Sequence, residues 1–184
     1  MIFRWKNVFN MLIIFSIYSF ANAADPITWK TYQNKQYQIS IPYPASWIYA
    51  PCISGYKNGQ NILCIGFQST SFKETPDRDY DILFELQPLN LEDSIDDDLS
   101  FNRSKTKFFK HGRLGDIEVQ HISGKTWQGI YANAPCKSSQ TYPAGECLTA
   151  ILSRDNYSAI FKTSTKEGTE IALKYMIPAF EFGQ

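Results

Sequence analysis

The stretch from Tyr32 to Pro51, YQNKQYQISIPYPASWIYAP, decides the fold of this chain. A polar turn, QNKQ at 33–36, follows the aromatic segment 29–32 and leads into a run in which apolar and polar residues alternate. One face of that run carries Tyr37, Ile39 and Ile41. Strict alternation is typical of a strand with one buried face, so the stretch predicts an opening β-hairpin.

Two prolines and a tryptophan follow this run. Pro42 and Pro44 cannot donate to a ladder of backbone hydrogen bonds. We therefore expect the chain to leave the sheet at these prolines, and Trp47 to fold back over the end of the core. The stretch predicts where the fold begins, and it indicates no reaction.

The rest of the chain has the pattern of one α+β domain. Short apolar or alternating runs predict strands over residues 48–49, 62–68, 80–86, 105–111, 117–124, 126–132, 147–153 and 157–163. Asn90 is placed to cap a helix over 91–101. The sequence STKE at 164–167 matches the capping box of a C-terminal helix, which Pro178 kinks or ends. We predict an antiparallel β-sheet flanked by helices, formed by residues 24–184.

Residues 1–23 have the pattern of an export signal. Arg4 and Lys6 precede a mostly apolar segment at 8–20, and Ala-Asn-Ala at 21–23 fits the small-residue cleavage pattern. A retained membrane anchor would need an apolar span of about 20 residues. The segment here is shorter and is interrupted by Asn10. We expect cleavage after Ala23 and a mature protein that is periplasmic or secreted, without stable membrane insertion.

The charge balance of the mature chain narrows the class of partner. The whole chain has 18 Lys+Arg and 18 Asp+Glu, and export removes two basic residues, Arg4 and Lys6, so the net charge becomes −2. A nearly neutral chain lacks the strongly basic surface that binds nucleic acid or an anionic membrane. We therefore expect another protein as the partner, and no nucleic acid.

All four cysteines lie after the signal segment. An even number in an exported chain favours disulfide bonds, and four cysteines allow three connectivities. We favour Cys52–Cys64 and Cys136–Cys147, because each pair brackets a loop whose ends a hairpin would bring together. A metal site would need close CxxC spacing, which the sequence lacks. The prediction is two disulfide bonds and no metal site.

The opening hairpin also resembles a known family. The residues that carry the resemblance are Tyr37, Ile39, Ile41, Tyr43, Pro44 and Trp47. An aromatic residue and a polar turn precede the motif Tyr-x-Ile-x-Ile-x-Tyr-Pro-x-x-Trp. This arrangement is similar to the start of PsbP-like/Mog1-like proteins. The resemblance implies an α/β/α sandwich and an accessory or binding role, and it brings no catalytic residues with it. The two cysteine loops depart from the family's pattern.

Few residues of the chain suit catalysis. The sequence has no GxSxG, HExxH, CxxC or phosphate-cradling glycine loop. His111 is expected in a turn, and His121 on the apolar face of strand 117–124 as a partly buried, hydrogen-bonded residue. A triad of one histidine, Asp116 and a serine is the hydrolase alternative. We predict no catalytic residue and no cofactor.

An acidic run, EDSIDDD at 92–98, is the first candidate for binding. Clustered carboxylates suit Ca²⁺, but the spacing is not that of an EF-hand, and no glycine supplies its sharp turn. A solvated helix face is the simpler interpretation. Asp96 and Asp97 on this face are candidates for recognising a basic partner.

The loop between Ala132 and Cys147 is the second candidate. Long loops in small domains often carry function, and a disulfide would lower the ordering cost of binding. The candidate partner-binding residues here are Tyr131, Asn133, Lys137, Tyr142 and Glu146. The alternative is a stapled loop without a partner.

We therefore predict an exported, non-enzymatic binding protein that acts through contact with a toxin or envelope protein. One specific hypothesis is an immunity-type inhibitor of a secreted toxin. A second class is an envelope accessory or ligand-carrying module, which a concave aromatic pocket beside the sheet would favour. A hydrolase would require His121 exposed in a cleft near a carboxylate and a serine.

Overall fold

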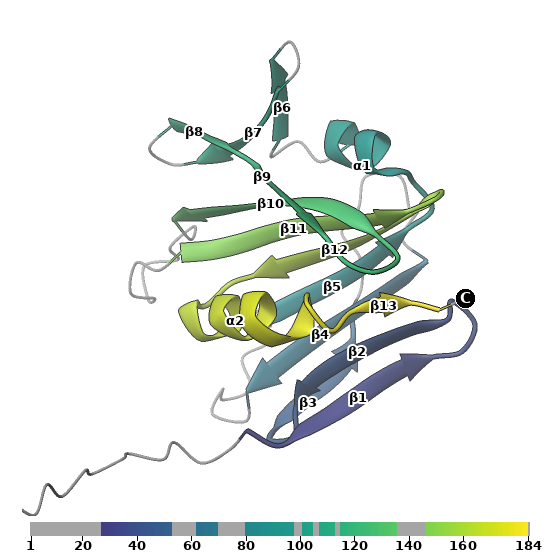
Figure 1. Cartoon of the computed structure of the whole chain (residues 1–184). Helices are drawn as coiled ribbons and strands as arrows, with labels where there is room; N and C mark the ends of the chain where they lie inside the picture. Colours follow the sequence, from purple (N-terminus) through teal and green to yellow (C-terminus); the bar gives the residue numbers. More distant parts are fainter. Residues whose placement is uncertain are drawn as a thin grey trace, which may run out of the picture.

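The computed structural model describes residues 27–52, 62–69, 80–97, 101–104, 107–112, 115–135 and 146–183. The described chain is predominantly antiparallel β-structure with few helices (Figure 1). The predicted signal, residues 1–23, lies outside these ranges. No helix among the described residues is long and apolar enough to cross a membrane.

A seven-stranded antiparallel sheet forms the centre of the molecule. Its order is β3 (Trp47–Pro51), β4 (Leu63–Ser69), β5 (Ile82–Gln87), β12 (Tyr157–Thr163), β11 (Glu146–Arg154), β10 (Gln128–Pro135) and β9 (Gln120–Ser123). Two three-stranded sheets accompany it. One contains β1 (Trp29–Asn34), β2 (Ile39–Pro44) and β13 (Glu181–Phe182); the other contains β6 (Phe101–Ser104), β7 (Lys107–Gly112) and β8 (Gly115–Glu118).

Each face of the central sheet has its own hydrophobic core. On the first face, the β1-β2-β13 sheet and helix α2 (Lys166–Ile171) cover the side chains of β4, β5, β11 and β12. A π-helical turn, η1 (Ala172–Met176), continues α2. On the second face, α1 (Leu91–Asp97) and the β6-β7-β8 sheet cover a smaller core on β10, β11 and β12. Short helices therefore flank the sheet, but strands supply most of the cover.

The opening hairpin is confirmed, but its turn lies at 35–38 rather than 33–36, so Tyr37 is in the turn and not in the strand. A second detail, at Pro42, is also wrong. Ile39 and Ile41 are buried as predicted, and Trp47 is buried at the start of β3. The chain does not leave the sheet at Pro42, because β2 continues to Pro44 and pairs Pro42 with Thr31. Strand β13 reaches only Ile39 and Ser40, so β2 has a single neighbour at Pro42 and tolerates the missing N–H.

The predicted strand 117–124 is in fact two strands in two sheets. Strand β8 ends at Glu118 and pairs with β7, whereas β9 begins at Gln120 and pairs with β10. Val119 lies between them, buried in the core of the second face. Because the chain changes sheets there, the alternation does not carry through, and His121 is exposed rather than partly buried.

Both predicted helices form, with different ends. Asn90 caps α1, since its Oδ1 accepts from the Asp93 N–H at 2.9 Å, but the helix ends at Asp97 because Phe101 is already paired in β6. Thr165, not Ser164, caps α2, and its Oγ1 accepts from the Gly168 N–H at 3.0 Å. Ser164 instead donates to the Tyr80 carbonyl.

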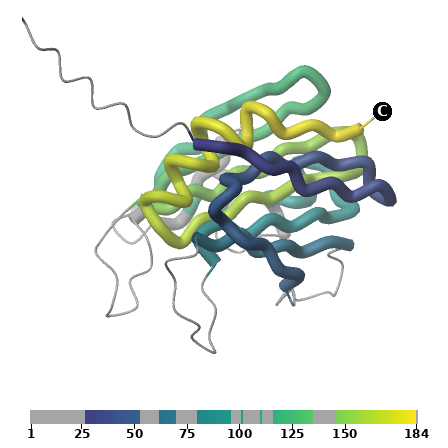
Figure 2. Tube along the Cα trace, turned by 90° about the horizontal axis from the view of Figure 1, so that it is seen from below, coloured from purple at the N-terminus to yellow at the C-terminus, as the bar shows by residue number. Residues whose placement is uncertain are grey.

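Strand β13 was not predicted from the sequence. It forms at Glu181–Phe182 after the helical segment ends near Pro178. The buried Trp127 indole donates from Nε1 to the Phe180 carbonyl at 3.0 Å and holds this segment down. Figure 2 shows the C-terminal segment running beside the β1–β2 hairpin, so the two ends of the domain share one sheet.

The Cys52–Cys64 disulfide is confirmed, with Cα atoms 5.2 Å apart. It joins the end of β3 to β4. Cys147 in β11 is also disulfide-bonded. Its predicted partner, Cys136, lies outside the described residues.

Candidate functional site

A cleft of about 310 Å³ opens where the β11–β12 turn meets the β1–β2 turn and the C-terminal strand. Its lining comes from four separate parts of the chain: Gln36, Tyr37, Gln38, Leu86, Arg154, Asp155, Tyr157, Phe182 and Gly183. A volume of this size is at the lower end of the range for small-ligand sites. The cleft therefore suits a small ligand.

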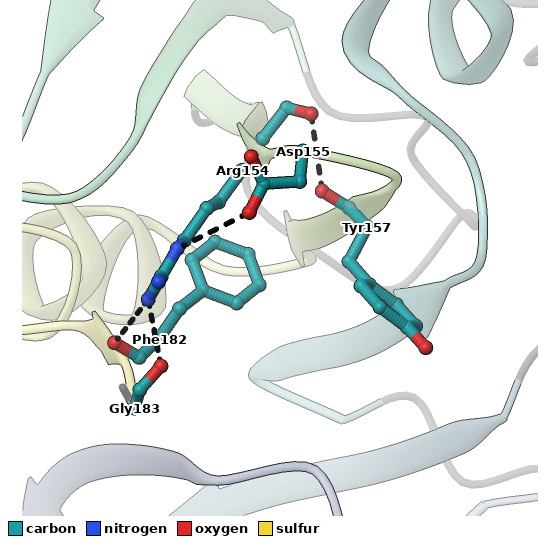
Figure 3. Close-up of polar contacts among 6 residues, drawn as sticks. Arg154, Asp155, Tyr157, Phe182 and Gly183 are labelled. Atoms are coloured by element: carbon teal, nitrogen blue, oxygen red, sulfur yellow. Dashed lines mark hydrogen bonds and ion pairs between the residues drawn. The ribbon is translucent and has the colours of Figure 1, made fainter.

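Arg154 holds one side of the cleft in place. Its Nη1 donates to the carbonyl oxygens of Phe182 at 3.2 Å and Gly183 at 2.6 Å, and its Nε lies 3.5 Å from Asp155 Oδ2 (Figure 3). The Gly183 N–H in turn donates to the Gln38 carbonyl. These bonds connect the end of β11, the last strand and the β1–β2 hairpin, so three walls of the cleft support one another.

Two tight turns present side chains at the cleft mouth. Arg154 pairs with Tyr157 across a two-residue turn, and Asp155 in that turn has a φ of 53°. Gln38, at the entry to β2, has a φ of 51°. Asp tolerates this left-handed region because its short polar side chain can bond locally, whereas Gln adopts it rarely. The β13 contact at its carbonyl holds Gln38 in this conformation.

Aromatic rings form much of the cleft surface. Phe182 lies buried beneath it with its ring centroid 4.9 Å from that of Phe180, and Leu86 is buried beside it. Tyr37 is half-buried and its hydroxyl accepts from Gln36 Nε2 at 3.1 Å. Tyr157 is 45% exposed. In the view of Figure 3 the Arg154 guanidinium and the Tyr157 ring leave the turn on opposite sides of the Phe182 ring.

Several polar atoms of the cleft have unused hydrogen-bonding capacity. Within the described part of the chain, Arg154 Nη2, the Asp155 Oδ1, the Gln38 amide and the Tyr157 hydroxyl have no partner. Solvent reaches this region, since the side chains of Arg154 and Asp155 are 31% and 82% exposed. The site therefore offers both donors and acceptors to a ligand.

The described lining contains no histidine, cysteine, serine, threonine or lysine. An arginine stays protonated at all ordinary pH, and it cannot act as a general base. Across the described residues, no group of three His, Cys, Asp or Glu side chains is placed to hold a metal ion.

The partner-binding residues predicted from the sequence do not form one surface. Tyr131 packs against the core of the first face, whereas α1, which carries Asp96 and Asp97, packs on the second face of the sheet. Glu146 begins β11, at the end opposite Arg154, and is exposed. Asp96 and Asp97 therefore belong to a different element from Tyr131 and Glu146, and a binding role for either group stays a prediction.

The base of the predicted loop has two polar features. The Tyr131 hydroxyl donates to Gln120 Oε1 on β9, and Asn133 Oδ1 is buried without a hydrogen-bond partner. Lys137 and Tyr142, the predicted residues of the loop itself, lie outside the described residues. The loop therefore stays a prediction.

The hydrolase alternative gains nothing from the described geometry. His121 is exposed, but it does not line the cleft, and no hydrogen bond or ion pair joins it to another described residue. His111 lies in β7 rather than in a turn, with Asp116 as its register partner on β8. Neither histidine belongs to the cleft.

Sequence reasoning missed the cleft because four distant segments build it. The Arg-Asp-Asn sequence at 154–156 indicates a turn, and nothing local indicates what that turn faces. The one available signal was the aromatic residue Tyr157 directly after this polar turn.

Comparisons with known proteins give little beyond the fold. No family model and no curated protein matches the chain. Among solved structures, the chain is similar to the solution structure of cyanobacterial PsbP (CyanoP) from Synechocystis sp. PCC 6803. The identity is 7%, the match covers 87% of this chain and 95% of that chain, and the TM-score is 0.47. Values at this level assign neither a family nor a function.

Proposed function

We propose that this chain is an exported, non-enzymatic binding protein that takes its ligand into the cleft at Arg154. The observation that carries the proposal is a concave, partly aromatic cleft beside the sheet, with unpaired donors and acceptors at its mouth. That combination is the usual form of a small-ligand site. It supports the ligand-carrying class over contact through a flat surface.

The walls of the cleft are held before any ligand arrives. Arg154 bonds two carbonyls of the last strand, and Gly183 bonds Gln38. A site held in this way loses less conformational freedom on binding, so more of the contact energy appears as affinity.

Export is consistent with the cysteine chemistry. The described chain contains a Cys52–Cys64 disulfide, and no described cysteine is free. Disulfides form and persist mainly in oxidising compartments. This supports a periplasmic or secreted location, as the 1–23 signal pattern predicts.

The test is an NMR titration of the oxidised, ¹⁵N-labelled chain lacking residues 1–23. The probes are glucose, N-acetylglucosamine, maltose, glutamate, lysine and hexanoate, followed by the low-mass fraction of an envelope extract. We expect amide shifts that saturate at residues 37, 155, 157 and 183. If neither a probe nor the extract shifts these amides, the cleft is not a ligand site and the proposal fails.

A second candidate is protein–protein contact through the loop between β10 and β11, including inhibition of a secreted toxin. The observation that favours it is the disulfide at Cys147, directly where β11 begins. A constrained loop at the end of a hairpin suits recognition. The test is a pull-down from envelope extract with the full mature chain and with a Lys137→Ala, Tyr142→Ala double variant. Equal capture by both would exclude the loop.

A further inference from the structure

We infer that the ligand of the Arg154 cleft is a neutral sugar. This inference rests on the proposed function and names its ligand class. Four features of the cleft support it: its charge, its unpaired polar atoms, its aromatic rings and its size.

The cleft has no net charge to attract an ion. Among its described lining residues Arg154 is the only cation and Asp155 the only anion, and their side chains lie 3.5 Å apart. Two carbonyl oxygens take further donors of the guanidinium. An anionic or cationic ligand would give up its hydration for a site whose own charges are already balanced.

A wholly apolar ligand fits no better. Among the described residues that line the cleft, only Leu86 and Phe182 present purely apolar side chains. A lipid chain or hydrocarbon in the cleft would cover the Gln38 amide and Arg154 Nη2 without offering them a hydrogen bond, which is unfavourable for polar groups.

A sugar complements what remains. Each hydroxyl group both donates and accepts, and two neighbouring hydroxyls can accept from Arg154 Nη2 and donate to Asp155 Oδ1, because both groups project from the same turn. The C–H face of a pyranose ring is apolar and packs well on an aromatic ring. Tyr157 and Tyr37 offer such rings, each with a hydroxyl at its tip.

The size of the cleft limits the ligand further. A volume of about 310 Å³ is small for a drug-sized molecule and suits one or two sugar rings. The same cleft is open at its mouth, since Tyr157 is 45% exposed there. A terminal sugar of a longer glycan could therefore enter with the rest of the chain outside.

The experiment compares the probe classes on the same labelled protein. We expect glucose, N-acetylglucosamine or maltose to bind at least tenfold more tightly than glutamate, lysine or hexanoate. Tyr157→Ala should weaken sugar binding at least tenfold, and Asp155→Asn should weaken it severalfold. Asn tolerates the left-handed φ at position 155, so the second variant keeps the turn.

The matched control is Tyr175→Ala. Tyr175 is 42% exposed and does not line the cleft, so its removal should leave sugar affinity unchanged. If a charged or apolar probe binds the cleft most tightly, the sugar inference is overturned and the proposed function stands. If neither any probe nor the envelope extract shifts the cleft amides, both are overturned.

Discussion

The Arg154 guanidinium donates from Nη1 to the Gly183 carbonyl oxygen at 2.6 Å and so joins the end of β11 to the last strand of the chain, 29 residues later. The same nitrogen donates to Phe182. This connection closes one side of the cleft and supports a two-residue strand, β13, which among the described strands pairs with β2 alone.

Arg154→Ala should release strand β13. The variant loses both carbonyl bonds, and charged donors to partly exposed carbonyls contribute about 1–2 kcal/mol in total. Urea unfolding should show this loss, and hydrogen exchange at Gly183 should accelerate. Asp155→Asn is the control, because the partner carboxylate is 82% exposed and should change stability by less than about 0.5 kcal/mol. If the rate of hydrogen exchange at the Gly183 amide is unchanged in Arg154→Ala, Arg154 does not hold this strand in place.

Gly183→Ala should disturb the same contact by a steric route. A Cβ at this position would lie 2.5 Å from Gln38 Cβ and 2.6 Å from the Gln38 carbonyl oxygen, and the backbone cannot give way as a side chain could. We expect a loss of about 1–3 kcal/mol in urea unfolding. Glu181→Ala, an exposed change on the same strand, should stay within about 0.5 kcal/mol of wild type. If both variants are equally stable, the backbone around Gly183 and Gln38 moves enough to accept the added Cβ, and the prediction is contradicted.

Asp81→Ala should weaken the joint between β4, β5 and α2. Asp81 is buried, with Oδ2 accepting from the Ser69 N–H at 2.8 Å and Oδ1 from Thr165 Oγ1 at 2.9 Å. Removing the carboxylate leaves these donors without their acceptor and loosens the residue that caps α2, at a cost of about 3 kcal/mol. Thermal unfolding measures the change. Thr126→Ala, at an exposed position, serves as the unaffected control.

The Cys52→Ala, Cys64→Ala double variant should be less stable by about 2–3 kcal/mol. The bond closes a segment with a sequence separation of 12 and links the edge strand β3 to β4. Urea unfolding without reductant measures the loss, and the Cys147 bond stays intact as an internal control. If the urea midpoint of the double variant is unchanged, the pairing of β3 with β4 alone sets the stability of this edge of the sheet.

Tyr43 should make the fold sensitive to alkali. Burial raises the pKa of its hydroxyl above the usual 10.0, with a smaller contribution from neighbouring Tyr49. The unfolded chain therefore loses this proton first, so stability is complete below pH 10 and falls as the pH rises through the folded-state pKa. Tyr43→Phe should flatten that fall in urea midpoints measured from pH 8 to pH 11. If the urea midpoints of the wild type and the variant fall equally over this pH range, the prediction is contradicted.

Local patterns predicted most strands because period-two alternation is a property of the segment itself. The run at 157–163 appears where its pattern places it, and the opening hairpin forms with its turn two residues later than predicted, at 35–38. One error came where a single segment serves two sheets. At Val119 the chain passes from one sheet to another, which reversed the expected burial of His121.

The sequence by itself determined the opening hairpin, the strand pattern and the Cys52–Cys64 pairing, because each depends on residues close together in the chain. Only the tertiary structure decided where the candidate site lies. The cleft requires Tyr37, Leu86, Arg154 and Phe182 to meet, and no local pattern specifies a contact between positions so far apart. It also placed Tyr131 on the first face of the sheet and Ala132, beside it, on the second face together with α1, because the pairing of distant strands sets which side each residue faces.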